Sequence, residues 1–389
     1  MAINFPSSPA DGTIFVPIAG TPFIYRNSVW KRPPIRTALP KNYFLNPCMQ
    51  VVQQYPYGTA LPSASGIVSA IAYPCDQWMV SWAVGPATYY TQIATGSSGR
   101  GTHSVLHLAL VAAGAVPAGG YLQIQQAIEG IAIAEFQWGT TSGKYAVFSF
   151  GFYTNIAGNY SVQIKNAGAN WTYTALFNAP ANAWTTVTVP IPPPPVGSVW
   201  NKQYNLGMNV GIGLAAGSPY NDGLAGGWNN SNKVTAVGAT MLSAAGGMCF
   251  FADAGFYMDP YQTGVAPPFE YPEYSNELRR CRRYWNRIYG SRGSSYTGGS
   301  AGSMTAPLGC YMLTNTAPVV SEVAVNGTIK IYDGTSTPSV ASILTNGHYS
   351  NYATFAADYS LTSALTVPRP ALQYYTSDAD YFAINRRMM

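Results

Sequence analysis

The central part of the chain alternates apolar and polar residues with a period of two. The clearest runs are Tyr121–Gln125, Tyr145–Phe152, Tyr160–Lys165 and Trp184–Val189. Such alternation is typical of strands, because successive side chains of a strand point to opposite faces of the sheet. Many short strands separated by Gly, Ser and Asn turn residues predict a jelly-roll β-sandwich over residues 41–272, and a mainly β fold class.

A proline-rich stretch, Pro190–Val196, interrupts this pattern. It has the composition of a stiff linker between domains, and equally of a rigid loop between two strands of one domain. We favour the loop, because alternating runs continue on both sides of it.

A different periodicity marks residues 273–290. Apolar residues recur there at spacings of three and four, which predicts a connecting α-helix with one apolar stripe, Leu278, Cys281, Trp285 and Ile288. Ser275 or Asn276 can cap its start, and Gly290 can end it.

Arginines occupy the other faces of this predicted helix: Arg279, Arg280, Arg282, Arg283 and Arg287. With Trp285 they could contact a neighbouring subunit, form a solvated surface, or bind nucleic acid. We favour assembly, with Trp285 and Ile288 against a neighbour and the arginines paired with acids across the interface.

The two ends of the chain differ from this central part. Residues 1–40 are rich in proline and predict an extended N-terminal arm, with room for one hairpin around Asp11-Gly12, that attaches to a larger particle. A disordered leader is the alternative. Residues 291–389 begin with a Gly/Ser stretch that resembles a linker. Strands are expected after it, which predicts a smaller C-terminal β-sandwich: Leu308–Leu313, Val319–Val325, Thr328–Tyr332, Tyr349–Ala356 and Tyr381–Asn385.

The amino-acid composition limits the classes of function that the chain can have. Only 9% of the 389 residues are charged, and 29 are tyrosine, which suits surfaces buried in an assembly or in contact with neutral ligands such as sugars. The net charge of +5 lies largely in the arginine segment, so the chain as a whole does not indicate nucleic-acid binding. Neither a secretion signal nor an apolar run long enough for membrane insertion is evident.

The five cysteines are scattered, with no CxxC pair. We therefore expect buried thiols rather than a zinc site or a disulfide framework. His103 and His107 could share a strand face as a metal pair, but no acidic residue or third histidine follows closely. A structural role is the better interpretation, and no metal or cofactor is predicted.

Catalytic patterns are weak. Gly298–Gly302 matches the G-x-S-x-G motif but lies in the Gly/Ser stretch, without the strand and helix that the motif requires. Two spaced carboxylate pairs, Glu129 with Glu135 on an expected strand and Asp253 with Asp259, leave a polysaccharide depolymerase as an alternative. We expect no enzymatic activity.

Sugar binding is better supported, by aromatic and amide side chains. Trp78, Trp82, Tyr89 and Tyr90 offer one cluster, although the two tryptophans are expected in the core. Trp228, Asn229 and Asn230, on the Gly-rich stretch GLAGGWNN, are the candidate glycan-binding residues.

Several segments together resemble bacteriophage tail-fibre and related virion proteins. The opening strand NPCMQVVQ and the later AYPCDQW match this family's N-x-x-M/F-x-V-x-Q and Y-x-x-D-x-W patterns. The similarity is strongest at FFADAGFYMDPYQTGVAPPFEYPEYSNELRRCRRY, which matches a last sandwich strand, a G-x-x-A-x-P-F-E turn and an E-L-x-x-C-x-R-Y helix. The similarity as a whole covers residues 41–290, and within this range it includes Ile128–Trp138 and Ala146–Tyr153. The helix here is more basic than is usual in the family.

The resemblance implies a virion structural protein, located on the phage particle and most simply on the tail, with a jelly-roll similar to carbohydrate-binding modules. We expect a homotrimeric fibre or appendage that contacts other virion proteins through its arm and host-surface glycans through its sandwich. A capsid-decorating protein without a receptor role is the alternative.

Overall fold

The structure is a computed structural model, and it describes most of the central chain together with shorter segments at both ends. The described residues are 6–9, 13–15, 23–26, 29–31, 40–55, 57–58, 60–62, 70–83, 88–95, 104–288, 292–298, 301–307, 323–326, 329–332, 340–343, 354–361, 372–375 and 381–385. The fold is mostly β and its sheets are antiparallel, as predicted. It separates into two compact units, each described by itself. The first comprises Met1–Met49, Tyr57–Pro74 and Trp78–Tyr271, and the second comprises Gln50–Pro56, Cys75–Gln77 and Pro272–Met389.

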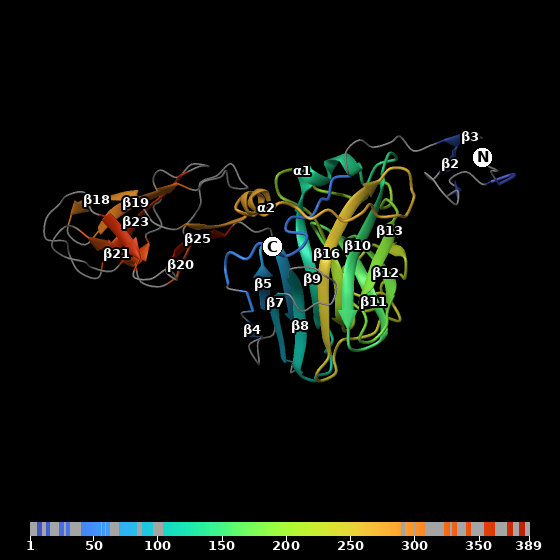
Figure 1. Cartoon of the computed structure of the whole chain (residues 1–389), viewed down its shortest axis with the longest axis horizontal. Helices are drawn as coiled ribbons and strands as arrows, with labels where there is room; N and C mark the ends of the chain where they lie inside the picture. Colours follow the sequence, from blue (N-terminus) through green and yellow to red (C-terminus); the bar gives the residue numbers. More distant parts are fainter. Residues whose placement is uncertain are drawn as a thin grey trace. The chain divides into compact units, whose positions relative to one another are not determined.

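The first unit is a β-sandwich of two sheets (Figure 1). In spatial order, the six-stranded sheet consists of β13 (Thr185–Ile191), β10 (Tyr145–Thr154), β16 (Met248–Asp259), β8 (Ser104–Ala112), β7 (Thr88–Thr95) and β4 (Leu61–Pro62). The seven-stranded sheet consists of β15 (Gly227–Asn229), β12 (Thr172–Ala179), β11 (Gly158–Asn166), β14 (Leu206–Ala216), β9 (Tyr121–Glu129), β6 (Trp78–Ala83) and β5 (Ala70–Cys75). The four alternating runs are confirmed as strands, and the proline stretch after β13 is a loop within this unit. The opening strand expected over residues 46–53 is wrong. These residues form turns and bends, because Asn46 and Met49 have φ angles of 49° and 55°, which a strand does not allow.

The core lies between the two sheets. The inward residues of β10 are Phe148, Phe150 and Phe152, and each is at most 1% exposed. They alternate with outward residues such as Tyr153, which accounts for the period of two. Trp78 and Trp82 belong to this core, as expected. Burial of each large side chain contributes about 1.5–3 kcal/mol.

One predicted strand is wrong. The stretch after β9 turns into a short helix, α1 (Gly130–Ile133), and a 3-10 turn, η1 (Ala134–Phe136). Gly130 allows the turn, because a Cβ there would lie 2.4 Å from the carbonyl oxygen of Asn201. Glu135 therefore lies on η1 and not on the strand that ends at Glu129.

The predicted helix over 273–290 is too long. Helix α2 runs from Tyr274 to Cys281, and Trp285–Ile288 form strand β17, which pairs with β25 (Tyr381–Asn385). The backbone of Trp285–Ile288 pairs with a strand that is distant in the sequence instead of continuing the helix. Local periodicity does not reveal such a pairing. The residue that caps the helix also differs from the prediction. Glu273 is the cap, because its carboxylate accepts the backbone amide hydrogens of Ser275 and Asn276 at 3.0 Å each.

The N-terminal region is not simply extended. It contains a three-stranded sheet of β1 (Ile14–Phe15), β2 (Phe23–Arg26) and β3 (Val29–Lys31). Short antiparallel pairings of aromatic and β-branched residues explain it, because such residues favour strands despite the flanking prolines.

The second unit carries three small antiparallel sheets besides α2. Their remaining strands are β18 (Arg292–Gly298), β19 (Ala301–Pro307), β20 (Val323–Asn326), β21 (Ile329–Tyr332), β22 (Val340–Ile343), β23 (Thr354–Leu361) and β24 (Leu372–Tyr375). The Gly/Ser stretch is therefore a pair of strands and not a linker. The strand predicted over Leu308–Leu313 lies outside the described residues.

Candidate functional site

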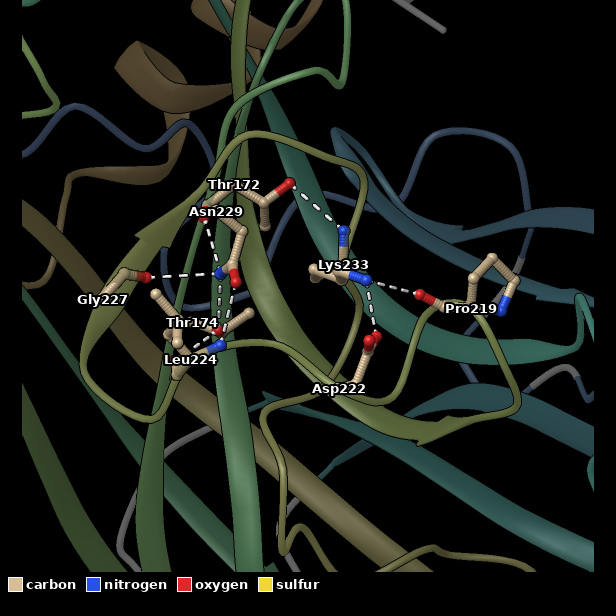
Figure 2. A network of polar contacts seen from close by, with 8 residues as sticks. All are labelled: Thr172, Thr174, Pro219, Asp222, Leu224, Gly227, Asn229 and Lys233. Carbon is tan, nitrogen blue, oxygen red and sulfur yellow. Dashed lines mark hydrogen bonds and ion pairs between the residues drawn. The ribbon is translucent and has the colours of Figure 1, made fainter.

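The predicted glycan-binding residues lie in the long loop that joins β14 to β16 and includes the short strand β15. Trp228 and Asn229 belong to β15, and Asn230 follows it. Asn229 holds this loop in place (Figure 2). Asn229 Nδ2 lies 3.1 Å from the carbonyl oxygen of Thr172 and 3.2 Å from Thr174 Oγ1. Its Oδ1 accepts the Leu224 amide at 3.0 Å. Only 9% of Asn229 is exposed, so its hydrogen-bonding capacity is used within the protein.

Lys233 connects a later part of the same loop to the part that follows β14 (Figure 2). Its Nζ donates to the Pro219 carbonyl oxygen at 2.9 Å and to Asp222 Oδ1 at 2.5 Å. The hydrogen bond from Lys233 lowers the pKa of the Asp222 carboxyl. The hydrogen bonds of Asn229 and Lys233 thus connect parts of the loop to one another and to β12.

Trp228 is half-buried and belongs to an inner aromatic cluster, which we define as Trp138, Tyr173, Trp200 and Trp228. Its ring centroid lies 5.6 Å from those of Trp138 and Trp200, and its Nε1 donates to the Pro192 carbonyl oxygen at 3.1 Å. Asn230 is exposed. Of the three predicted residues, one side chain is therefore open to solvent, one is partly open and one is committed to the loop.

A second aromatic cluster lies on the outward face of the six-stranded sheet. We call it the aromatic row and define it as Trp184, Tyr153, Phe250, His107 and Gln92. Strand register brings them together: Tyr153 pairs with Phe250, Phe250 with His107, and His107 with Gln92. Trp184 precedes β13 and lies beside Tyr153.

The rings of the row stack on one another. Phe250 lies 4.5 Å from His107 at an interplanar angle of 26°, and 6.3 Å from Trp184 at 30°. Tyr153 lies 5.8 Å from Trp184 and is tilted by 50°, so the two rings form a corner. Trp184, Tyr153, Phe250 and Gln92 are all half-buried, and His107 is 8% exposed.

The row is uncharged and carries hydrogen-bonding groups at both ends. Burial lowers the pKa of His107, which keeps the imidazole neutral at pH 7. Gln92 Nε2 lies 3.3 Å from His107 Nδ1, and the Tyr153 hydroxyl lies 3.4 Å from Asn182 Oδ1. The next outward positions in register, Thr186, Gly151 and Ala252, are neutral as well. This arrangement offers apolar ring surface beside amide and hydroxyl groups.

Sequence reasoning did not find the aromatic row. Trp184 and Phe250 each stood in a recognised strand segment, but their residues are far apart in the chain and only strand register brings them together. His107 lies on β8, as expected for a strand residue, whereas its predicted partner His103 lies outside the described residues.

The predicted assembly residues do not share one helix face. Arg279 and Arg280 are exposed on α2, and Arg280 Nη1 lies 2.8 Å from Glu277 Oε2. Arg282 and Arg283 follow the helix and are half-buried. Trp285 is 2% exposed in β17, so its ring is buried within the chain rather than presented to a neighbour. Arg287 also lies on β17.

The carboxylates of the two spaced pairs have different surroundings. Glu135 Oε1 lies 3.1 Å from Lys41 Nζ, in a pocket of about 210 Å³ that Tyr43, Lys144 and Met258 also line. Burial raises the pKa of Glu135, but hydrogen bonds from Tyr43 and Lys41 outweigh it and leave the pKa lowered. Asp259 holds the following turn through Thr263 Oγ1 and Gly264 N. Glu129 is buried at the end of β9, and Asp253 is buried in β16 with φ near 50°.

Within the described ranges, no group of three His, Cys, Asp or Glu residues is placed to hold a metal ion. Cys48, Cys75, Cys249 and Cys281 are buried thiols, as predicted, and Cys310 lies outside the described part. The segment Gly298–Gly302 joins β18 to β19, without a following helix. Among the described helices, none has the length and apolar character needed to cross a membrane.

No protein-family model matches the chain, and no curated protein matches it. Solved structures show low similarity. A bacteriophage CBA120 tailspike protein 4 enzymatically active domain is 12% identical over 47% of this chain and 19% of its own, with a TM-score of 0.27. The family 11 carbohydrate-binding module of Clostridium thermocellum, in complex with a β-1,3-1,4-mixed-linked tetrasaccharide, is 13% identical over 50% of this chain and 96% of its own, with a TM-score of 0.26. A putative sugar-binding protein from Bacteroides thetaiotaomicron is 14% identical over 56% of this chain and all of its own, with a TM-score of 0.27. At these values the likenesses carry no argument about function.

Proposed function

We propose that the chain is a non-enzymatic attachment protein of a phage particle, and that its larger sandwich binds a neutral glycan at the aromatic row. The observation that carries the proposal is the row itself. Three half-buried aromatic rings, from β10, β16 and the residue before β13, meet on the outward face of one sheet, beside amide and hydroxyl groups. Apolar ring surface with a few polar partners is the usual lining of sugar sites.

The corner between Trp184 and Tyr153 is the centre of this proposed site. The C–H face of a sugar ring would pack on Trp184, and its hydroxyls would reach Asn182 and the Tyr153 hydroxyl. Since the five row residues are neutral at pH 7, a neutral sugar would lose no ion pair on binding. The stacking of Phe250 on His107 holds the neighbouring ring in place, so little side-chain freedom would be lost.

A test compares glycan-array binding of the wild type with that of Trp184→Ala. We expect the wild type to bind neutral glycans, and the variant to bind at least about tenfold more weakly. Tyr204→Ala is the control, because Tyr204 is an aromatic residue of the same unit that lies outside the row and is 52% exposed. Equal binding by the wild type and Trp184→Ala would remove the row from the proposal.

The Gly-rich loop is the second candidate surface, because Asn230 is exposed and Trp228 is half-buried. Asn230→Ala distinguishes it from the row. Loss of glycan binding in Asn230→Ala, with binding kept in Trp184→Ala, would transfer the proposed site to the loop.

The virion role is supported by the resemblance of residues 41–290 and by the low charge of the chain. In this proposal the chain is a homotrimer, contacts other virion proteins through residues 1–40 and lies on the tail. Electron microscopy of phage particles labelled with an antibody to this chain tests it. We expect label at the tail; label on the head would favour the capsid-decorating alternative, and unlabelled particles would contradict the virion role.

The absence of catalysis is tested separately. Host envelope polysaccharide is incubated with the protein, and released oligosaccharides are measured. We expect none above background. Release that Glu129→Gln or Asp253→Asn abolishes would favour the depolymerase alternative.

A further inference from the structure

The first unit contains an open pocket that the proposed glycan site does not use. Four segments build it: residues 40–43, the turn η1, the residue before β10 and the end of β16. Its volume is about 210 Å³, and its lining consists of Pro40, Lys41, Tyr43, Glu135, Lys144 and Met258. Met258 and Phe250 of the aromatic row both lie on β16, and the strand rises roughly 25 Å between them. The pocket and the row are therefore separate sites.

Tyr43 forms a fixed wall of this pocket. Its ring centroid lies 4.7 Å from that of Phe136 and 6.4 Å from that of Phe256, and both phenylalanines are fully buried. The backbone N–H of Tyr43 also donates to the Phe256 carbonyl oxygen at 2.9 Å. Because ring and backbone are both attached to the core of the sandwich, little conformational freedom would be lost when a ligand packs against this wall.

Glu135 and Tyr43 position the ammonium group of Lys41. Lys41 Nζ lies 3.1 Å from Glu135 Oε1 and 4.4 Å from the centroid of the Tyr43 ring. The Tyr43 hydroxyl donates to the same carboxylate. Burial raises the pKa of the Glu135 carboxyl, but the hydrogen bonds from Tyr43 and Lys41 leave it lowered, so Glu135 is ionised at pH 7. One positive charge is thus held at a defined place in the pocket.

Lys144 supplies a second positive charge. Its backbone is fixed on both sides, because its N–H donates to the Phe136 carbonyl oxygen at 2.9 Å and its carbonyl oxygen accepts from Trp138 Nε1 at 2.7 Å. Its ammonium group acts on Glu135 electrostatically, while the direct ion pair of Glu135 is with Lys41. The lining therefore carries two ammonium groups and one carboxylate, which gives a net charge of +1 at pH 7.

Access, charge and size limit the ligand that this pocket can take. The side chains of Lys41 and Glu135 are 57% and 49% exposed, so the charged groups can be reached from solvent. One negative charge would neutralise the lining, whereas a cation would be repelled by the two lysines and a dianion would leave an excess of negative charge beside Glu135. Pockets for drug-sized ligands measure about 300–1,000 Å³, so this smaller one has room for about one ring.

We infer that this pocket binds a small monocarboxylate with a single ring, whose carboxylate pairs with Lys41 and Lys144 and whose ring packs against Tyr43 and Met258. Pairing of a carboxylate with two ammonium groups gives charge-assisted hydrogen bonds, which are stronger than neutral ones. Glu135 has further lone pairs, so it would accept a hydrogen bond from a hydroxyl group on the ring. The site is independent of the proposed neutral-glycan site and gives the sandwich a second specificity.

Isothermal titration calorimetry of the full chain tests the charge with three probes of similar size: glucuronate, glucose and glucosamine. We expect glucuronate to bind at least about tenfold more tightly than the other two, because it alone carries a negative charge. Benzoate is the fourth probe and has the carboxylate without hydroxyl groups. Tighter binding of glucuronate than of benzoate would identify an acidic sugar as the ligand class, and the reverse would identify an aromatic acid. Equal binding of the three sugars, or no binding of either acid, would overturn the site.

Variants locate the binding. Lys144→Met should weaken the binding of the preferred acid at least about tenfold. Lys202→Met is the matched control, because Lys202 is a lysine of the same unit that is also half-buried and lies outside the pocket lining. This control and Trp184→Ala should both leave the binding unchanged. Thermal melting shows whether each variant is folded.

A second readout does not depend on any variant. In nuclear magnetic resonance of the wild type, the preferred acid should shift the signal of the Lys144 side-chain methylene next to its ammonium group, and glucose should not. Unchanged binding by folded Lys144→Met, loss of binding in Trp184→Ala, or an unshifted Lys144 signal would overturn the site. Failure of neutral-glycan binding at the aromatic row would leave this result untouched, so the two proposals are tested separately.

Discussion

The inner aromatic cluster and the aromatic row contain the same kinds of side chain but differ in their surroundings. In the inner cluster, Trp138 and Trp200 are at most 6% exposed and Trp228 donates its N–H to a backbone oxygen. In the row, the three aromatic rings at the open end are half-buried and lie beside hydroxyl and amide groups. The comparison teaches that a tryptophan in a Gly-rich sequence can be structural, even on a short edge strand such as β15, while the half-buried rings of the row lie on the outward face of a sheet.

The largest expected effect is on stability, in the inner cluster. Trp138→Ala should lower the free energy of unfolding by about 3–5 kcal/mol, because it leaves a large cavity among packed rings. Trp184→Ala should lower it by about 1 kcal/mol, the contribution of a half-buried aromatic pair. Chemical denaturation measures both. Equal costs would contradict the distinction between a structural cluster and a surface row.

Lys165→Met should have the next largest effect, and in the opposite direction. Burial lowers the pKa of Lys165 to about 7, so the folded state binds fewer protons than the unfolded state between that pH and the ordinary lysine pKa. The penalty is therefore full below pH 7 and disappears as the pH rises toward the ordinary value. We expect the variant to be more stable by about 1–4 kcal/mol at pH 6.

Urea denaturation of both proteins from pH 6 to pH 10 measures this prediction. The difference between the variant and the wild type should shrink steadily as the pH rises. A constant difference would mean that the ammonium is solvated in the folded protein.

Asn229, whose hydrogen bonds Figure 2 shows, and the exposed Asn230 that follows it offer a matched pair. Asn229→Ala should cost about 1–3 kcal/mol, because it leaves the Leu224 amide and Thr172 carbonyl without their partner. Asn230→Ala should change stability by less than about 0.5 kcal/mol. Thermal melting compares them, and a reversal of the two would show that the loop is held differently.

The smallest expected effect is that of Tyr153→Phe. The hydroxyl makes only a long contact with Asn182, so stability should change by less than about 0.5 kcal/mol. Glycan affinity should fall several-fold if the hydroxyl contacts a sugar. Unchanged affinity would assign Tyr153 a purely apolar role.

The strands were readable from sequence because one face of each is buried. Phe148, Phe150 and Phe152 alternate with outward residues, and that pattern survives in any antiparallel sandwich. The helix over 273–290 was overestimated because Trp285 and Ile288 fit a helical stripe as well as a strand, and only their pairing with β25 decides between them.

The candidate sites were less predictable for the same reason. Trp228 was conspicuous because its neighbours in sequence are glycines and asparagines, but its contacts are with Trp138 and Trp200. The aromatic row depends on register among four strands and the residue before β13. Neither arrangement is encoded in a local motif.

The most direct test of the account is the affinity of a neutral oligosaccharide, chosen from the glycan array, for two tryptophan variants. Trp184→Ala removes a half-buried ring of the row, and Trp228→Phe keeps an aromatic ring in the inner cluster while it removes the indole N–H. Calorimetric titration should give a dissociation constant at least about tenfold weaker for Trp184→Ala and nearly unchanged for Trp228→Phe. Binding that is kept in Trp184→Ala and lost in folded Trp228→Phe would contradict the account.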